Sequence, residues 1–140
     1  MKYAQFGDRY LIRLMKGEEI VEALAGFAQE KKIRAAAVSG IGAVRNIVLG
    51  YFDPETREYL REEFPESFEL AGMNGNLSLL DGKPTLHLHA VLADRSHRAR
   101  AGHLFSARVS VTVEVTLVPF SGTVERKWEE EIGLNLLQLP

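Results

Sequence analysis

The chain has 140 residues, of which 46% are hydrophobic and 26% are charged, and it contains no cysteine. These values fit one globular domain over residues 1–140 and exclude disordered and fibrous classes. The formal net charge of -2 argues against a surface that is basic throughout, although a local basic patch stays possible.

The lack of cysteine excludes disulfides, thiolate metal sites and a cysteine nucleophile. A transition metal in this chain would have to bind imidazole, carboxylate and water. No run of about 18 apolar residues occurs, and the first residues carry no apolar signal segment. We therefore expect a cytoplasmic protein with no membrane partner.

The first third of the chain predicts a strand and then a helix. Residues 9–14 follow a Gly7-Asp8 turn signal and have strand character. Residues 18–31 have apolar side chains at helical spacing and acidic side chains on the remaining face. This is the one substantial helix that the sequence predicts, and its expected role is to cover a sheet.

Two further strands are expected around a glycine-rich segment. Residues 35–38 predict a short strand, residues 39–43 a turn, and residues 44–52 a second strand. Gly40 and Gly42 begin a dinucleotide-binding pattern, but its third glycine is missing and a strand follows, so we interpret the segment as a structural turn. A short strand at 58–61 should pair back with the strand before it.

The second half predicts a series of strands joined by turns. Residues 72–76 carry a loop or bulge signal, and Asp81-Gly82 predicts a two-residue hairpin turn. Counting outward from that turn places Asn76 opposite His87, as a candidate partner for the histidine. The remaining expected elements are a basic loop at 93–102, a long alternating strand at 106–118, an edge strand at 123–128 and a return to the core at 132–137.

These elements predict an α+β fold. Several neighbouring strands are joined by short turns, which favours a mixed or mostly antiparallel sheet. We expect about seven strands in a single domain, with one main helix packed on the sheet.

The most informative stretch is the strand at residues 85–92, which contains His87 and His89. Side chains two positions apart on a strand share a face, so the two imidazoles should lie together. His103 follows Gly102, which suggests a glycine-hinged turn that brings in a third imidazole. Three histidines can hold zinc or a similar divalent ion and leave a coordination position open. A pair of satisfied core histidines is the alternative.

Other polar residues have two interpretations each. Arg95, Arg98 and Arg100 could grip a phosphate or carboxylate if their loop folds over the histidines, or they could be solvated. Glu114 could be a ligand or general base, a contact between subunits, or simply exposed. His97 is expected to be solvated, and no serine lies in a nucleophile motif.

The stretches 75–78, 81–84, 87–94 and 102–104 resemble the PPC domain (plants and prokaryotes conserved), in its stand-alone prokaryotic form without an AT-hook. The resemblance implies a homotrimer with a mixed sheet and packed helices, and a metal site at the positions of His87, His89 and His103. Ala101 stands where the family tends to have a second glycine.

The resemblance also implies an association with DNA, because the plant members carry AT-hooks and assemble with other nuclear proteins. This chain contains no Arg-Gly-Arg-Pro core of an AT-hook, and its acidic net charge does not favour DNA binding. The function expected from the resemblance is a homotrimeric, DNA-associated regulatory assembly module that binds a divalent metal, zinc, with direct DNA binding possible but supported by neither the charge nor an AT-hook. The alternative is a metal-dependent small-molecule or anion-binding protein, or a hydrolase-like enzyme that uses the open metal position.

Overall fold

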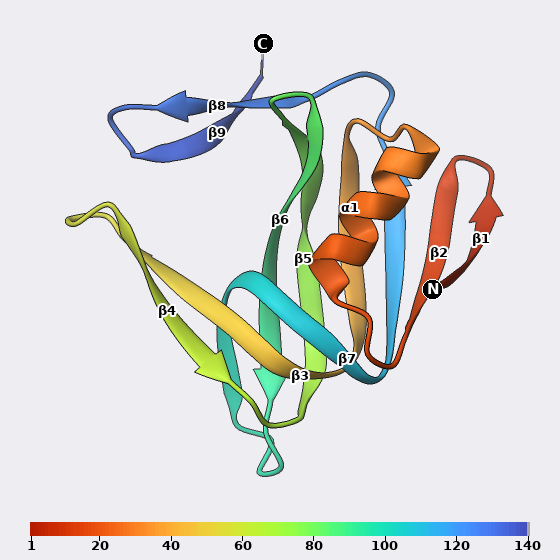
Figure 1. Ribbon diagram of the computed structural model, residues 1–140, viewed down its shortest axis with the longest axis vertical. Helices are drawn as coiled ribbons and strands as arrows, with labels where there is room; N and C mark the ends of the chain where they lie inside the picture. The colour runs from red at the N-terminus through yellow and green to blue at the C-terminus, as the bar shows by residue number, and fades with distance from the viewer. Residues whose placement is uncertain (140) are drawn as a thin grey trace.

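The computed structural model describes residues 1–139 as one helix and one nine-stranded sheet (Figure 1). This arrangement confirms the predicted α+β class, and its strand pairs are antiparallel except for one parallel bridge between β5 and β8. The elements in chain order are β1 Lys2–Phe6, β2 Arg9–Met15, α1 Ile20–Lys31, β3 Ala36–Asp53, β4 Glu58–Phe64, β5 Phe68–Leu80, β6 Lys83–Ala93, β7 Ala99–Pro119, β8 Glu125–Glu129 and β9 Leu134–Gln138.

Helix α1 covers one side of the sheet, as the sequence predicts (Figure 1). Its side chain contacts with the sheet come from Ile20, Leu24 and Phe27, which are all buried in the core. Glu19 caps the N-terminus by accepting a hydrogen bond from the backbone N–H of Glu22, and Lys32 ends the helix in a left-handed conformation.

Strand β3 is continuous, so the turn predicted at residues 39–43 is wrong. The segment forms an irregularity inside the strand, where the pairing register shifts between Gly40 and Gly42. A Cβ on Gly42 would collide with the backbone of β7, so the glycine allows the two strands to approach closely. The first half of β3 pairs with β5, and its second half pairs with β4 in an arm that projects from the sheet (Figure 1).

The hairpin between β5 and β6 confirms the prediction at Asp81-Gly82. Both turn residues have positive φ, as a tight two-residue turn requires. The register places Asn76 opposite His87, which is the predicted pairing. No loop forms at residues 72–76, where the sequence predicts a loop or bulge. The pairing register of β5 shifts instead between Leu70 and Gly72.

Strands β6 and β7 form a second hairpin whose turn is shorter than the loop predicted at 93–102. The turn covers residues 94–98, where Asp94 accepts backbone hydrogen bonds from Ser96 and Arg98. Strand β7 pairs with β6 near this turn and with β2 and β3 farther along. Strands β3, β5, β6 and β7 each pair with two others of the four, which closes a ring of strands around the core.

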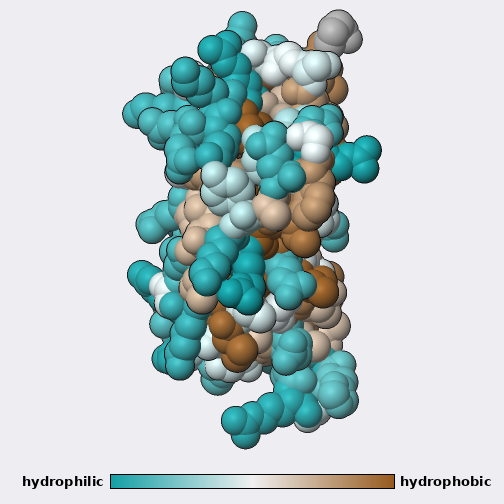
Figure 2. Space-filling model, turned by 90° about the vertical axis from the view of Figure 1, so that its right-hand side faces the viewer, coloured by the Kyte–Doolittle hydropathy of each residue, from teal (hydrophilic) through white to brown (hydrophobic). Residues whose placement is uncertain are grey.

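Strands β8 and β9 form a second projecting arm, so residues 132–137 do not return to the core as expected. Their hairpin joins the rest of the sheet through one bridge between Leu79 and Glu125. Within residues 1–139, no helix is long and apolar enough to cross a membrane. Apolar and hydrophilic side chains are interspersed over the side of the molecule shown in Figure 2.

Candidate metal centre

His87 and His89 lie on the outer face of β6, as the strand alternation predicts. The residues between and after them, Leu88 and Ala90, are buried in the core. His103 comes from β7 and is the direct cross-strand partner of His89. The third histidine therefore lies within a strand, and the glycine-hinged turn expected at Gly102 is wrong.

Gly102 has a different structural role. A Cβ at this position would lie 2.9 Å from the backbone oxygen of Gly50 on β3. The absence of a side chain therefore allows β7 to pack closely against β3 next to His103.

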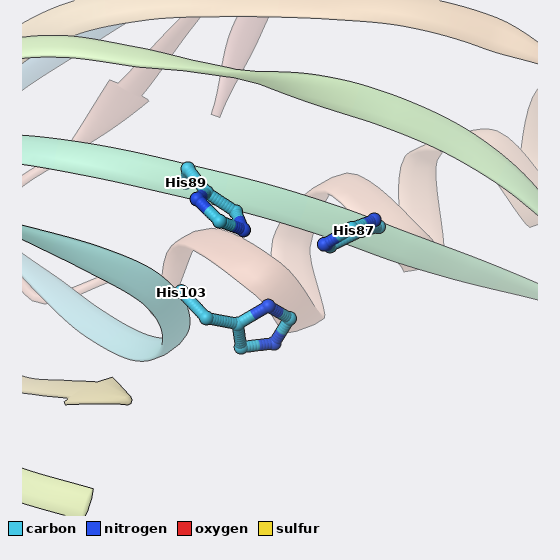
Figure 3. Close-up of side chains that lie close together, drawn as sticks. All are labelled: His87, His89 and His103. Atoms are coloured by element: carbon cyan, nitrogen blue, oxygen red, sulfur yellow. The ribbon is translucent and has the colours of Figure 1, made fainter. Parts of the chain in front are cut away.

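The three imidazoles face one another (Figure 3). Their ring centroids are 5.2 Å apart for His87 and His89, 5.2 Å for His87 and His103, and 5.6 Å for His89 and His103. One nitrogen from each ring lies within 4.8 Å of the others. One nitrogen of each ring is therefore placed where the three could hold a single ion.

The donor set fits a divalent metal. His103 Nδ1 is buried and has no hydrogen-bond partner, which costs free energy unless a ligand satisfies the nitrogen. Three imidazoles without a thiolate suit zinc and its neighbours in the first transition series. His87, His89 and His103 would hold the ion, which would act there as a Lewis acid with a position open to water or another ligand.

Burial keeps two of the imidazoles in the form that binds a metal. Burial lowers the pKa of His87, with smaller contributions from Arg126 and His89. Burial, followed by the neighbouring His87 and His89, lowers the pKa of His103 to about 4. Both rings are therefore neutral at pH 7 and need lose no proton to coordinate an ion.

Aromatic side chains border the triad on the side of His103. The rings of Tyr59 from β4 and Phe105 from β7 lie 5.0 Å and 4.6 Å from the His103 ring. Both rings occupy the space beside Gly50, where a Cβ would collide with Phe105 and touch Tyr59. Gly50 pairs with both Arg61 and His103, so its missing side chain makes room for these rings.

Two arginines near the triad carry no signal in the sequence that would link them to it. Arg126 on β8 donates hydrogen bonds to Asn76 Oδ1 at 2.8 Å, Ser78 Oγ at 2.9 Å and the backbone oxygen of Asn135 at 3.0 Å. Arg61 on β4 stacks on the Phe105 ring, with its guanidinium carbon 3.9 Å from the ring centroid. The projecting hairpins that carry Arg61 and Arg126 are distant from the histidines in sequence. Only the folded sheet brings these arginines close to the histidines.

Of the other candidates from the sequence, the structure brings only Asn76 to the triad. Arg95, Arg98 and Arg100 lie around the far turn of the β6–β7 hairpin, where they line a surface pocket together with acidic residues. Glu114 is exposed and pairs with Arg13 and Ile41 on another part of β7. Arg95 and Arg98 lie in the turn beyond the strand ends, and Arg100 lies over the Phe64 ring. Glu114 lies well along β7 from His103, at about 3.3 Å per residue.

The fold and the triad together define a class: small α+β proteins with three histidines grouped on the outer face of a bent, mostly antiparallel sheet. Residues 1–121 match the family model of the Plants and Prokaryotes Conserved (PCC) domain. The chain belongs to this family, which confirms the resemblance seen in the sequence.

Solved structures share the whole fold. A suspected DNA-binding protein from Bacteroides thetaiotaomicron is 32% identical, with a TM-score of 0.94 over 98% of this chain and 96% of that one. A metal-containing protein from Archaeoglobus fulgidus is 40% identical, with a TM-score of 0.90 over 99% of this chain and 100% of that one.

One sequence relative is much longer. The bifunctional protein GlmU of a Synechococcus strain is 31% identical over 110 residues, which cover 77% of this chain. The match spans only 16% of the length of that relative.

Proposed function

We propose that residues 1–140 form one PCC domain that binds a divalent metal ion, zinc, through His87, His89 and His103. We further propose that the domain assembles as a cytoplasmic homotrimer and serves as a regulatory assembly module in DNA-associated complexes. The single observation that carries the metal proposal is the convergence of three imidazole nitrogens within 4.8 Å. The unpartnered buried nitrogen of His103 and the metal-containing relative support it.

The metal proposal is tested by elemental analysis and zinc titration of protein purified without a histidine tag. We expect one zinc ion per chain in the wild type and loss of tight binding in His103→Ala. His97→Ala is the matched control, because His97 is exposed in the β6–β7 turn. A triple variant without His87, His89 and His103 that retained the same bound zinc would refute the proposal.

The outer face of the sheet supports self-association. Helix α1 covers the opposite face, whereas Leu11 on β2 and Ile41 on β3 are 51% and 56% exposed. Arg13 and Glu114 are cross-strand partners on the same outer face, so a second copy could meet both charges. We propose that this face is buried between the subunits of the homotrimer.

The DNA-associated role rests on the family and on the relative from Bacteroides thetaiotaomicron. A fluorescence anisotropy titration with duplex DNA at about 50 mM and 200 mM salt tests direct contact, because phosphate contacts weaken steeply with added salt. Binding at low salt that falls at high salt would support direct contact. Absence of binding at low salt would limit the domain to contacts through other proteins.

A second candidate function is favoured by the number of ligands. Three protein ligands leave one position of a tetrahedral zinc ion for water, a small molecule or an anion. The domain would then be a metal-dependent small-molecule or anion-binding protein, or a hydrolase-like enzyme. A fourth protein ligand, detected by X-ray absorption of the zinc-loaded protein, would exclude this function.

A further inference from the structure

The surroundings of the triad are positively charged. Arg126 bonds Asn76, the cross-strand partner of His87, and Arg61 stacks on Phe105, whose ring lies 4.6 Å from the His103 ring. The candidate metal cluster itself contains histidines alone. A divalent ion held here would add two more positive charges to a site without an acidic counterion.

The position of Arg126 follows from the sheet register. Asn76 and Ser78 alternate onto the same face of β5, and Asn76 is the cross-strand partner of His87. Arg126 bonds both side chains, so its guanidinium lies on the face that carries the imidazoles. Its three acceptors are all uncharged. An arginine has five N–H donors, so two stay available after these three bonds.

Arg61 and Tyr59 approach the triad from the opposite arm. They are two residues apart on β4 and therefore share a face. Arg61 pairs with Gly50, which pairs with His103, so one row of residues runs from the guanidinium across the sheet to the imidazole. The Tyr59 ring lies against the His103 ring, and its phenol O–H can donate a hydrogen bond.

We propose that Arg126, Arg61 and Tyr59 form a recognition rim that binds an oxyanion, the carboxylate or phosphate group of a small molecule, at the open position of the metal ion. The inference rests on the proposed metal function and names the ligand class of the same site. Guanidinium groups suit this role because their planar donors match the oxygens of both anions. Arg95 and Arg98 take no part, because acidic residues line the pocket around them, and the Arg100 guanidinium lies over the Phe64 ring at 5.3 Å from its centroid.

The test uses the untagged full chain, stripped with a chelator and reloaded with one equivalent of Co²⁺. Inorganic phosphate and acetate are titrated separately in a non-coordinating buffer, and the absorption bands of the cobalt ion report ligands at the open position. The cobalt content is measured before any anion is added. Comparison of the two dissociation constants shows which oxyanion the rim prefers.

We expect one anion per cobalt ion in the wild type. Arg126→Gln should weaken anion binding about ten- to a hundredfold, because one charge-assisted contact is lost. Arg61→Gln should act in the same direction and is exposed, so it keeps the test valid if the first variant perturbs the β8–β9 arm. Tyr59→Phe should have a smaller effect. Arg95→Gln, in the distant turn, is the matched control and should bind like the wild type.

Three results would overturn the proposal. One is a cobalt-loaded wild type whose spectrum does not respond to either anion. Another is an unchanged anion affinity in both arginine variants, and the last is equal phosphate binding by the cobalt-loaded and the metal-free chain in titration calorimetry. Failure of the wild type to hold cobalt would refute the proposed metal function instead, and it would be seen before the anion titration.

Discussion

Arg126 donates a 2.8 Å hydrogen bond to Asn76, the residue directly opposite His87 in the β5–β6 ladder. The same guanidinium bonds the backbone oxygen of Asn135 on β9. One side chain therefore links the β8–β9 arm to the strand pair that carries two of the histidines. Within residues 1–139, the arm has one β-bridge of its own to the sheet, between Leu79 and Glu125.

Removal of this side chain should release the arm. We expect Arg126→Ala to speed amide hydrogen exchange in β8 and β9 about tenfold or more, while the amides of β2 and the second half of β7 keep their rates. Lys127→Ala is the matched control, because Lys127 is the next residue on β8 and is exposed. Equal exchange in the two variants would show that Arg126 does not hold the arm.

The metal-free protein should lose stability as the pH falls from about 6.5 to about 4. In this range the unfolded chain binds a proton at His103, which has an ordinary pKa of 6.5, whereas the folded protein resists protonation because its pKa is about 4. This contribution is fully present above pH 6.5 and is lost on acidification.

Urea unfolding across this pH range, in the presence of a chelator, measures the effect. His103→Gln should reduce the loss of unfolding free energy by about 1 to 2 kcal/mol. This is less than the full pKa shift of His103 would give, because the ring is only half-buried. Parallel pH profiles for the wild type and the variant would contradict the assignment.

A methyl group at Gly75 should disturb the histidine strand. A Cβ there would collide with the backbone oxygen of His87, so β5 and β6 would have to separate at this point. We expect Gly75→Ala to lower the free energy of unfolding by about 1–3 kcal/mol and to weaken zinc binding. Gly72→Ala, on the same strand with open space around it, is the control and should change stability by less than about 1 kcal/mol.

A charge on the outer sheet face should break the proposed homotrimer. Ile41 is 56% exposed in the single chain and is the cross-strand partner of Glu114, so an introduced carboxylate would face a like charge and would lose its hydration in the trimer. We expect Ile41→Glu to be monomeric in light scattering, with the mass falling to about one third of the wild-type value. Leu60→Glu on the projecting β4 is the control. A wild type that is monomeric by itself would refute the trimer.

The sequence predicted local features of the site well. The period of two placed His87 and His89 on one face, and the Asp81-Gly82 turn fixed the pairing of Asn76 with His87 because a tight turn allows one register. It failed where glycines serve long-range contacts. Gly42 and Gly102 lie in segments whose composition is typical of turns, yet both glycines allow two strands to pack closely. This close packing depends on a partner strand that is distant in sequence.

The residues around the triad could not be predicted for a related reason. Arg126, Arg61 and Tyr59 belong to arms that no local pattern directs toward β6. A cross-strand row that joins Arg61, Gly50, His103 and His89 exists only once β3, β4, β6 and β7 are all paired.

All three histidines belong to the single β6–β7 hairpin, whereas Arg61 and Arg126 come from the arms on either side of it. A metal ion can therefore clamp this hairpin early, while the rest of the chain is still folding, and part of its binding energy then goes to the unfolded ensemble. The recognition rim forms only in the finished molecule. Metal binding would thus report the formation of the β6–β7 hairpin, and anion binding would report the complete fold.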